Sequence, residues 1–126
     1  MSPSNAIYSQ LANHNLFNKR IKFGLKRIKL ALSKLGHPEK KINNVISVLG
    51  ESGKFTTLSS LKSFIEANGQ TVSTYISPSI QDIRERFYMG KRYLTHKEIK
   101  DTIKEIEKLK IPLTIYEVLT LIYVIN

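Results

Sequence analysis

The sequence contains no cysteine, only three histidines, and only ten acidic residues among its 126 positions. Without cysteine, disulfide frameworks, thiolate zinc sites and cysteine nucleophiles are all excluded, and a reducing cytoplasm is the expected location. The one long apolar run, IYEVLTLIYVIN, is shorter than the roughly 20 residues that a membrane-spanning helix needs. The opening MSPSNAIYSQLANHN also lacks the charged and apolar segments of a signal peptide. We therefore expect a cytoplasmic domain with one hydrophobic core and no contact with a membrane.

Because acidic residues are scarce, 20 Lys and Arg outweigh 10 Asp and Glu and give a formal net charge of +10 at pH 7. A positive field attracts nucleic acid, phosphorylated small molecules and polyacidic substrates. AT-biased coding, which enriches Lys, Ile and Asn, accounts for the same balance without any partner. The charge alone therefore leaves an anionic partner and a solvated surface as two open interpretations.

The first third of the chain changes character near residue 16. Residues 1–15 are polar and carry no hydrophobic period, which predicts a flexible lead-in. From Phe17 to Leu35 a period of three and four residues predicts a helix that Gly36 and Pro38 end. Its apolar side holds Ile21, Leu25, Ile28, Leu32 and Leu35, and its other sides hold Lys19, Arg20, Lys22, Lys26, Arg27, Lys29 and Lys34. This basic face is an alternative site for a nucleic acid, although such faces are more often simply solvated.

The middle of the chain predicts a strand, a helix and a second strand. NVISVLG, residues 44–50, is apolar on both alternations, as expected of a central parallel strand covered on both faces. Leu58, Leu61 and Ile65 form the apolar stripe of the following helix, and Gly69 stands where a left-handed cap belongs. TVSTYIS is rich in β-branched residues and ends at Ser77 before a proline. Together these segments predict one right-handed crossover unit of a parallel sheet.

The last third predicts a short hairpin and two helices. ERFYMGKRYLT has the pattern of a hairpin that turns near Gly90. Thr95 and Glu98 have capping-box spacing at the start of a helix with Ile99, Ile103, Ile106 and Leu109 on one face. Pro112 separates this helix from TIYEVLTLIYVIN, which is apolar nearly all round and therefore needs burial.

The stretch VISVLGESGKFTTL has the local pattern of a phosphate-binding loop. Glycines let backbone N–H groups turn towards an anion, the helix N-terminus adds partial positive charge, and a lysine reaches the phosphates. The residues expected to contact a nucleotide are Gly50, Ser52, Gly53, Lys54, Thr56 and Thr57. The usual pattern has a further glycine five residues before Gly53, where this chain has Val48.

At this loop the chain resembles folylpolyglutamate synthase, a family of the Mur ligase superfamily whose loop typically reads G-T-N-G-K-G-S. Three further blocks are similar to the family in the same order. LKRIKLALSKLGHPEKKINNVISVLG resembles the opening helix, turn and first strand, YISPSIQDIRERF resembles the Y-T-S-P-H-L loop with its N-E-R continuation, and IPLTIYEVLTLIYV resembles the P-I-T-F-F-E helix. The resemblance covers about residues 24 to 125.

The resemblance implies an α/β fold: part of a three-layer domain of the phosphate-loop type, residues 16–126, with a parallel sheet flanked by helices and a short hairpin. It implies an ATP-dependent ligase that activates a pterin-linked carboxylate as an acyl phosphate and joins it to glutamate, with ATP and Mg²⁺ as cofactors. Lys54 matches the family's phosphate-binding lysine, and Ser77 and Glu117 match its magnesium-binding serine and glutamate. Without the family, Ser77 is a turn residue before Pro78, and Glu117 completes a capping box with Thr114.

Several positions depart from the family pattern. Phe55 replaces a small residue directly after the lysine, and Glu51 brings a carboxylate into a loop meant for anions. Ser79 stands where the family has histidine, and Arg84 begins RER in place of N-E-R. Family members are also considerably longer, so we expect an N-terminal ATP-binding fragment that is inactive alone.

Other partners of such a fragment are the rest of the ligase or a second copy of the chain. Two alternatives remain: a remnant that docks on an intact ligase, and a small basic nucleic-acid-binding protein. The second is disfavoured because no nucleic-acid signature is present.

Overall fold

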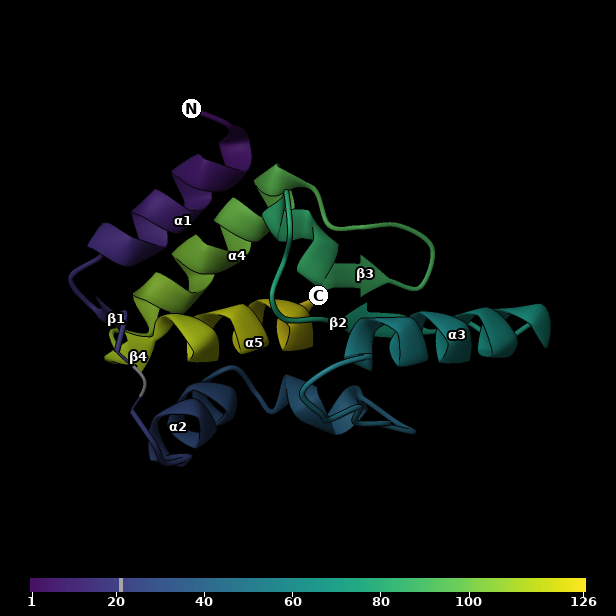
Figure 1. The fold of residues 1–126 in the computed structure, drawn as a ribbon. Coiled ribbons are helices and arrows are strands. Elements are labelled where there is room, and N and C mark those ends of the chain that lie inside the picture. Colours follow the sequence, from purple (N-terminus) through teal and green to yellow (C-terminus); the bar gives the residue numbers. More distant parts are fainter. Residues whose placement is uncertain (21) are drawn as a thin grey trace. The chain divides into compact units, whose positions relative to one another are not determined.

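The computed structural model describes residues 1–20 and 22–126. The chain divides into two compact units (Figure 1). Met1–Ile42 and Leu94–Asn126 together form what we call the terminal unit, and Asn43–Tyr93 forms the central unit.

The terminal unit is built on a short parallel pair of strands covered by helices. β1 (Phe17–Asn18) pairs in parallel with β4 (Leu113–Thr114), with Phe17 opposite Leu113. Its helices are α1 (Pro3–Asn13), α2 (Lys26–Lys34), the short 3-10 helix η1 (Pro38–Lys41), α4 (His96–Lys108) and α5 (Ile115–Ile125). Helix α4 packs against both α1 and α5, and α2 packs against α5. The core that results holds Ile7, Leu11, Phe17, Ala31, Leu94, Ile99, Ile103, Ile106, Ile111, Leu113, Val118, Leu119, Leu121 and Ile122.

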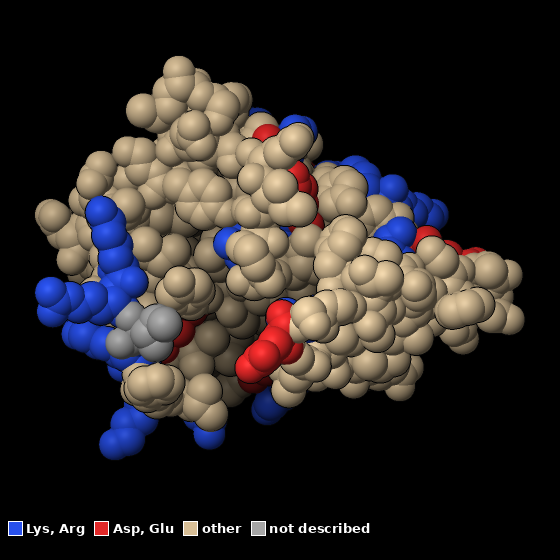
Figure 2. Space-filling model, viewed as in Figure 1, with Lys and Arg blue, Asp and Glu red and all other residues tan. Residues whose placement is uncertain are grey.

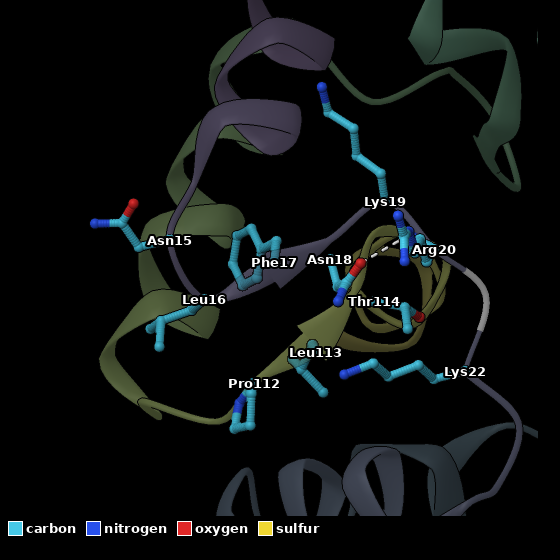
Figure 3. A pocket seen from close by; sticks show the side chains of 10 residues that line it. All are labelled: Asn15, Leu16, Phe17, Asn18, Lys19, Arg20, Lys22, Pro112, Leu113 and Thr114. Atoms are coloured by element: carbon cyan, nitrogen blue, oxygen red, sulfur yellow. Dashed lines mark hydrogen bonds between the residues drawn. The ribbon is translucent and has the colours of Figure 1, made fainter.

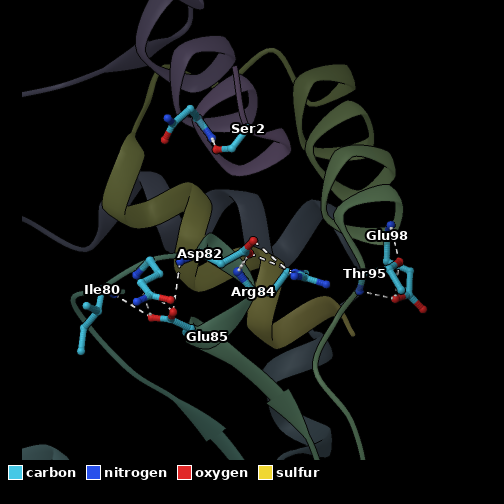
Figure 4. Close-up of polar contacts among 9 residues, drawn as sticks. Ser2, Ile80, Asp82, Arg84, Glu85, Thr95 and Glu98 are labelled. Atoms are coloured by element: carbon cyan, nitrogen blue, oxygen red, sulfur yellow. Dashed lines mark hydrogen bonds and ion pairs between the residues drawn. The ribbon is translucent and has the colours of Figure 1, made fainter.

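Both C-terminal helices begin where the sequence predicts. Thr95 accepts a hydrogen bond from the Glu98 N–H while the Glu98 carboxylate accepts one from the Thr95 N–H, which completes a capping box (Figure 4). Thr114 and Glu117 form the same arrangement at the start of α5. Each box provides acceptors for two backbone N–H groups that the helix itself leaves without partners.

The expectation of a flexible lead-in over residues 1–15 is wrong for α1. The Ser2 hydroxyl accepts a hydrogen bond from the Asn5 N–H at 3.2 Å, and Pro3 occupies the first helical position. Ile7 and Leu11, four residues apart, lie on one face and are fully buried. Two apolar anchors were too few to stand out as a period, yet they are enough to fix a helix that has a core to pack against.

The helix predicted from Phe17 to Leu35 begins only at Lys26. Phe17 belongs to β1, and the Asn18 side-chain oxygen accepts a hydrogen bond from the Arg20 N–H at 2.8 Å, a local bond that competes with helix formation. Gly24 has a φ of 111°, which no helix contains. Of the predicted apolar stripe, Ile21 lies outside the described residues. The C-terminal end is as predicted, because Gly36 adopts a φ of 76° and stops the helix.

The central unit contains α3 (Lys54–Ala67), β2 (Ser73–Tyr75), the 3-10 helix η2 (Ile83–Arg86) and β3 (Phe87–Met89). Helix α3 and its left-handed cap at Gly69, with a φ of 75°, confirm the sequence prediction. The hairpin turn at Gly90 is confirmed as well, because the Met89 N–H donates to the Arg92 carbonyl at 2.8 Å and Tyr88 bridges to Tyr93.

The predicted crossover unit is wrong in its pairing. Residues 45–50 have no strand assignment, and Val45 and Leu49 are 72% and 90% exposed. β2 instead pairs in antiparallel fashion with β3, with Thr74 opposite Tyr88. A β-strand requires a neighbouring strand with which it forms backbone hydrogen bonds, and none of the described strands pairs with residues 45–50.

At the level of class, the prediction holds: the fold is α/β, with a small parallel sheet, flanking helices and a hairpin. No helix within the described residues has the length and apolarity needed to span a membrane.

Candidate functional site

The glycine-lysine loop lies in the central unit and leads directly into α3. Gly53 is the residue before the helix and has a φ of 74°, a conformation that glycine adopts without strain. Its carbonyl accepts the first helical hydrogen bond, from the Thr57 N–H at 2.9 Å. No side chain caps this helix start. The N–H groups of the first turn are therefore the kind of donors that bind an anion at a helix N-terminus.

Lys54, the first residue of α3, folds its side chain back over the loop. Its Nζ donates hydrogen bonds to the carbonyl oxygens of Gly50 and Glu51, the second at 3.0 Å. The ammonium group is thus held beside the main chain of the loop by neutral acceptors. A phosphate oxygen, being charged, is a stronger acceptor than either carbonyl.

The two residues that depart from the family pattern leave the loop open. Phe55 is 62% exposed, so its ring is not buried within the loop. Glu51 is also exposed, and its charge is therefore screened by solvent. Among the other predicted contacts, Ser52, Thr56 and Thr57 are exposed. Gly50, Ser52, Gly53, Lys54, Thr56 and Thr57 are thus brought together on one accessible segment.

Ser77, the first predicted metal ligand, is exposed and follows β2 in the central unit. It lies in the segment between β2 and η2, which Glu85 organises. No role was predicted for Glu85 from the sequence. The available signal was local: Asp82 and Glu85 have capping-box spacing, and the structure contains that box.

Glu117, the second predicted metal ligand, lies in the terminal unit at the start of α5. Its Oε2 accepts hydrogen bonds from the Thr114 N–H at 2.7 Å and from Arg27 Nε at 3.1 Å. Its Oε1 is buried and has no hydrogen-bond partner. The capping-box interpretation is therefore confirmed for one carboxylate oxygen, while the other is a buried oxygen that no described group satisfies.

Arg27, the partner of Glu117, was predicted from the sequence only as one residue of the basic helix face. Its guanidinium group also donates to the carbonyl of Lys22 at 2.6 Å. The side chains of Arg27 and Glu117 are 24% and 12% exposed, so this ion pair is largely withdrawn from water. Across the described residues, no three acidic or histidine side chains gather into a group that could hold a metal by themselves.

A hollow of about 340 Å³ opens in the terminal unit beside β1 and β4. Lys19, Arg20 and Lys22 lie around it, together with Pro112 and Thr114 (Figure 3). Figure 2 shows basic side chains projecting from the surface in this part of the molecule, over β1 and the segment that leads to α2. The hollow therefore suits an anionic or partly anionic small molecule.

A glycine-lysine loop that opens a helix, in an α/β fold with a small parallel sheet, is typical of nucleotide-binding proteins of the phosphate-loop class. Comparison with known proteins shows which members of this class the chain is similar to. No family model matches the chain. A dihydrofolate synthase/folylpolyglutamate synthase from Bacillus subtilis is 42% identical over 71 residues, which are 53% of this chain and 16% of that protein.

Two solved structures share the fold. The Escherichia coli FolC structure in complex with DHPP and ADP has a TM-score of 0.83 and 34% identity. The bifunctional folylpolyglutamate synthase/dihydrofolate synthase of Yersinia pestis, complexed with AMPPNP and Mn, has a TM-score of 0.82 and 28% identity. Both alignments cover 98% of this chain and 30% of the other.

The chain is thus similar in sequence and in fold to part of the folylpolyglutamate synthase/dihydrofolate synthase family, and the resemblance predicted from the sequence is confirmed. It spans less than a third of the length of these relatives.

Proposed function

We propose that this chain is the N-terminal ATP-binding portion of a ligase of the folylpolyglutamate synthase type, and that it does not complete the ligation by itself. The observation that carries the proposal is the loop: Gly53 in a left-handed conformation, Lys54 folded over the main chain, and an uncapped α3 behind them. The related structures with ADP or AMPPNP support ATP as the nucleotide.

In this proposal Lys54 exchanges its two carbonyl partners for oxygens of the β- and γ-phosphates. Gly50 and Gly53 let the backbone approach the phosphates, and the hydroxyls of Thr56 and Thr57 stand in the first turn of α3. Transfer of a phosphoryl group to a carboxylate requires charge neutralisation and alignment more than covalent chemistry from the protein. A lysine and backbone donors at a helix start provide both.

The resemblance selects two oxygen donors for a divalent metal, each in its own unit. In the central unit Ser77 offers an exposed hydroxyl. In the terminal unit the Oε1 of Glu117 has no hydrogen-bond partner. Mg²⁺ in such a role neutralises phosphate charge and prefers oxygen ligands. The Mn ion in the Yersinia pestis relative supports a divalent cation.

The hollow beside β1 and β4 is our candidate site for a folate-type substrate. Its basic lining, Lys19, Arg20 and Lys22, complements the carboxylates that such a molecule carries. The DHPP in the Escherichia coli relative supports a pterin-linked compound. A cytoplasmic location, association with the rest of a ligase or with a second copy, and the nucleic-acid alternative stay predictions.

Titration calorimetry with Mg-ATP tests the proposal. We expect binding that Lys54→Met reduces by at least tenfold, which corresponds to about 1.4 kcal/mol. Lys97→Met, which removes an exposed lysine from α4, is the matched control and leaves binding unchanged.

If the natural chain binds no nucleotide, the same titration is repeated with the double variant Glu51→Thr/Phe55→Gly, in which the loop is restored to the family pattern at these two positions. Binding restored by this repair shows that the loop is an altered copy of a working site. No binding by either protein refutes the proposed nucleotide function.

A further inference from the structure

The segment that carries Ser77 is closed at its base. The Ile76 N–H donates to the Arg86 carbonyl at 3.2 Å, and Arg86 Nη1 donates to the Ile76 carbonyl at 3.5 Å. Arg86 is buried, so this closure is part of the packed central unit. Residues 77–85 therefore leave and re-enter the fold at one fixed place.

Glu85 ties the middle of the same segment together. Its Oε2 accepts a hydrogen bond from the Ile80 N–H at 2.7 Å, and its Oε1 accepts from the N–H groups of Gln81 and Asp82, each at 3.1 Å. Figure 4 shows the carboxylate beneath the main chain of this turn, with dashed lines to it. The pKa of Glu85 is lowered mainly by the hydrogen bond from Ile80, against burial and the charge of Asp82, which raise it. A carboxylate that binds several backbone N–H groups is a stronger anchor than a neutral side chain.

These contacts restrict the backbone on both sides of Ser77. Only Ser77, Pro78 and Ser79 lie between the base of the loop at Ile76 and the anchored amide of Ile80. Proline fixes one of the backbone angles in this stretch. A three-residue span with both ends held has few conformations left, whereas the whole segment held only at its base has many.

We propose that Glu85 is a positioning residue that sets the orientation of Ser77 by holding the backbone of Ile80, Gln81 and Asp82. The proposal rests on the proposed function, in which Ser77 is a metal ligand. Glu85 itself touches neither metal nor nucleotide. Residues that orient a metal ligand commonly contribute ten- to a hundredfold to metal affinity.

Glu85→Gln is the informative variant, because an amide keeps one acceptor but turns an NH₂ donor towards backbone N–H donors. Glu105→Gln, on the exposed side of α4, removes the same charge elsewhere and is the matched control. We expect hydrogen exchange at the amides of Ile80, Gln81 and Asp82 to rise by at least about tenfold in Glu85→Gln only. Unchanged exchange at these amides refutes the proposal.

The second measurement is Mn²⁺ binding in the presence of an ATP analogue, followed by electron paramagnetic resonance. Glu85→Gln is expected to weaken binding about tenfold in the natural chain and to have no further effect in a Ser77→Ala background. Equal losses in both backgrounds, or no loss with a loosened loop, show that Glu85 does not act through Ser77.

If the natural chain binds no Mn²⁺, the proposed metal site is refuted. In that case, hydrogen exchange at the backbone N–H of Ser77 is compared between the natural chain and Glu85→Gln. Faster exchange in the variant supports the positioning role of Glu85, and unchanged exchange refutes it.

Discussion

Arg27→Met tests the ion pair that holds Glu117 at the start of α5. The substitution removes the guanidinium group and keeps an unbranched side chain of good helix propensity. It eliminates the 3.1 Å hydrogen bond to Glu117 and the 2.6 Å hydrogen bond to the Lys22 carbonyl. The first joins α2 to α5, and the second fixes the backbone that enters α2.

The size of the effect follows from how far the pair is withdrawn from water. An exposed ion pair contributes only about 0.2–1 kcal/mol, whereas breaking a fully buried one costs about 3–5 kcal/mol. Side-chain exposures of 24% for Arg27 and 12% for Glu117 lie between these limits, nearer to the buried one. We therefore expect Arg27→Met to lower the free energy of unfolding by about 2 kcal/mol.

Urea unfolding measures this loss. With a slope of about 2 kcal/mol per molar, typical for a chain of this size, the midpoint falls by about 1 M. Lys29→Met, an exposed lysine on the same helix, is the control and shifts the midpoint little. A double-mutant cycle with Glu117→Gln should give a coupling energy of about 1 kcal/mol or more. A loss equal to that of the control, or a coupling energy near zero, refutes the reasoning.

Three further predictions concern the core, a turn and pH. Ile103→Ala removes a fully buried side chain of α4 and should lower the free energy of unfolding by about 2–5 kcal/mol in the same urea assay. Gly90→Ala places a Cβ 2.6 Å from the Thr71 methyl carbon at a φ of 75°, so it should destabilise more than Gly36→Ala, which has the same backbone strain and nothing within 4 Å; equal thermal shifts contradict this. The pKa of Glu85 is lowered from 4.5, so its contribution to stability is present above pH 4.5 and is lost as the pH falls through the lower folded value; NMR titration of its carboxyl carbon measures that midpoint.

The sequence predicts those parts of the fold whose signals are local. The capping boxes at Thr95 and Thr114 each depend on two side chains three residues apart, and both form. The cap at Gly69 and the turn at Gly90 depend on a single residue that tolerates a positive φ. In each of these cases, the groups that decide the structure lie within three residues of one another in the chain.

Prediction failed where the outcome depends on a distant partner. The apolar residues 44–50 have the composition of a central strand, but composition does not supply a hydrogen-bonding neighbour. β1 forms because Phe17 meets Leu113, almost a hundred residues away, and that pairing draws the segment out of the predicted helix. α1 is stabilised because Ile7 and Leu11 are buried in a core that other segments of the terminal unit complete.

The residues of the candidate site differ in how visible they are in the sequence. Lys54 and its glycines could be proposed as a phosphate site because they are close together in the loop. Arg27 was missed because its contact with Glu117 joins residues 90 positions apart in the chain. Glu85 was missed although its capping-box spacing with Asp82 is a local signal. Both are charged side chains in partly buried positions, and this is the feature that separates them from the many solvated charges of the chain.

If the loop binds a nucleotide as proposed, we expect its departures from the family pattern to change affinity more than geometry. Gly53 has a left-handed φ and Lys54 folds over the loop, while Phe55 and Glu51 are exposed. A carboxylate about 4 Å from a phosphate charge costs only about 1 kcal/mol in water-like surroundings, which is less than a tenfold change in affinity. In the proposed complex, Lys54 exchanges its hydrogen bonds to two neutral carbonyls for hydrogen bonds to charged phosphate oxygens, which are stronger acceptors. Hydrogen bonds that involve charged groups contribute about 1.5–3 kcal/mol each. Repair of Glu51 alone should therefore raise nucleotide affinity by less than the loss of Lys54 lowers it.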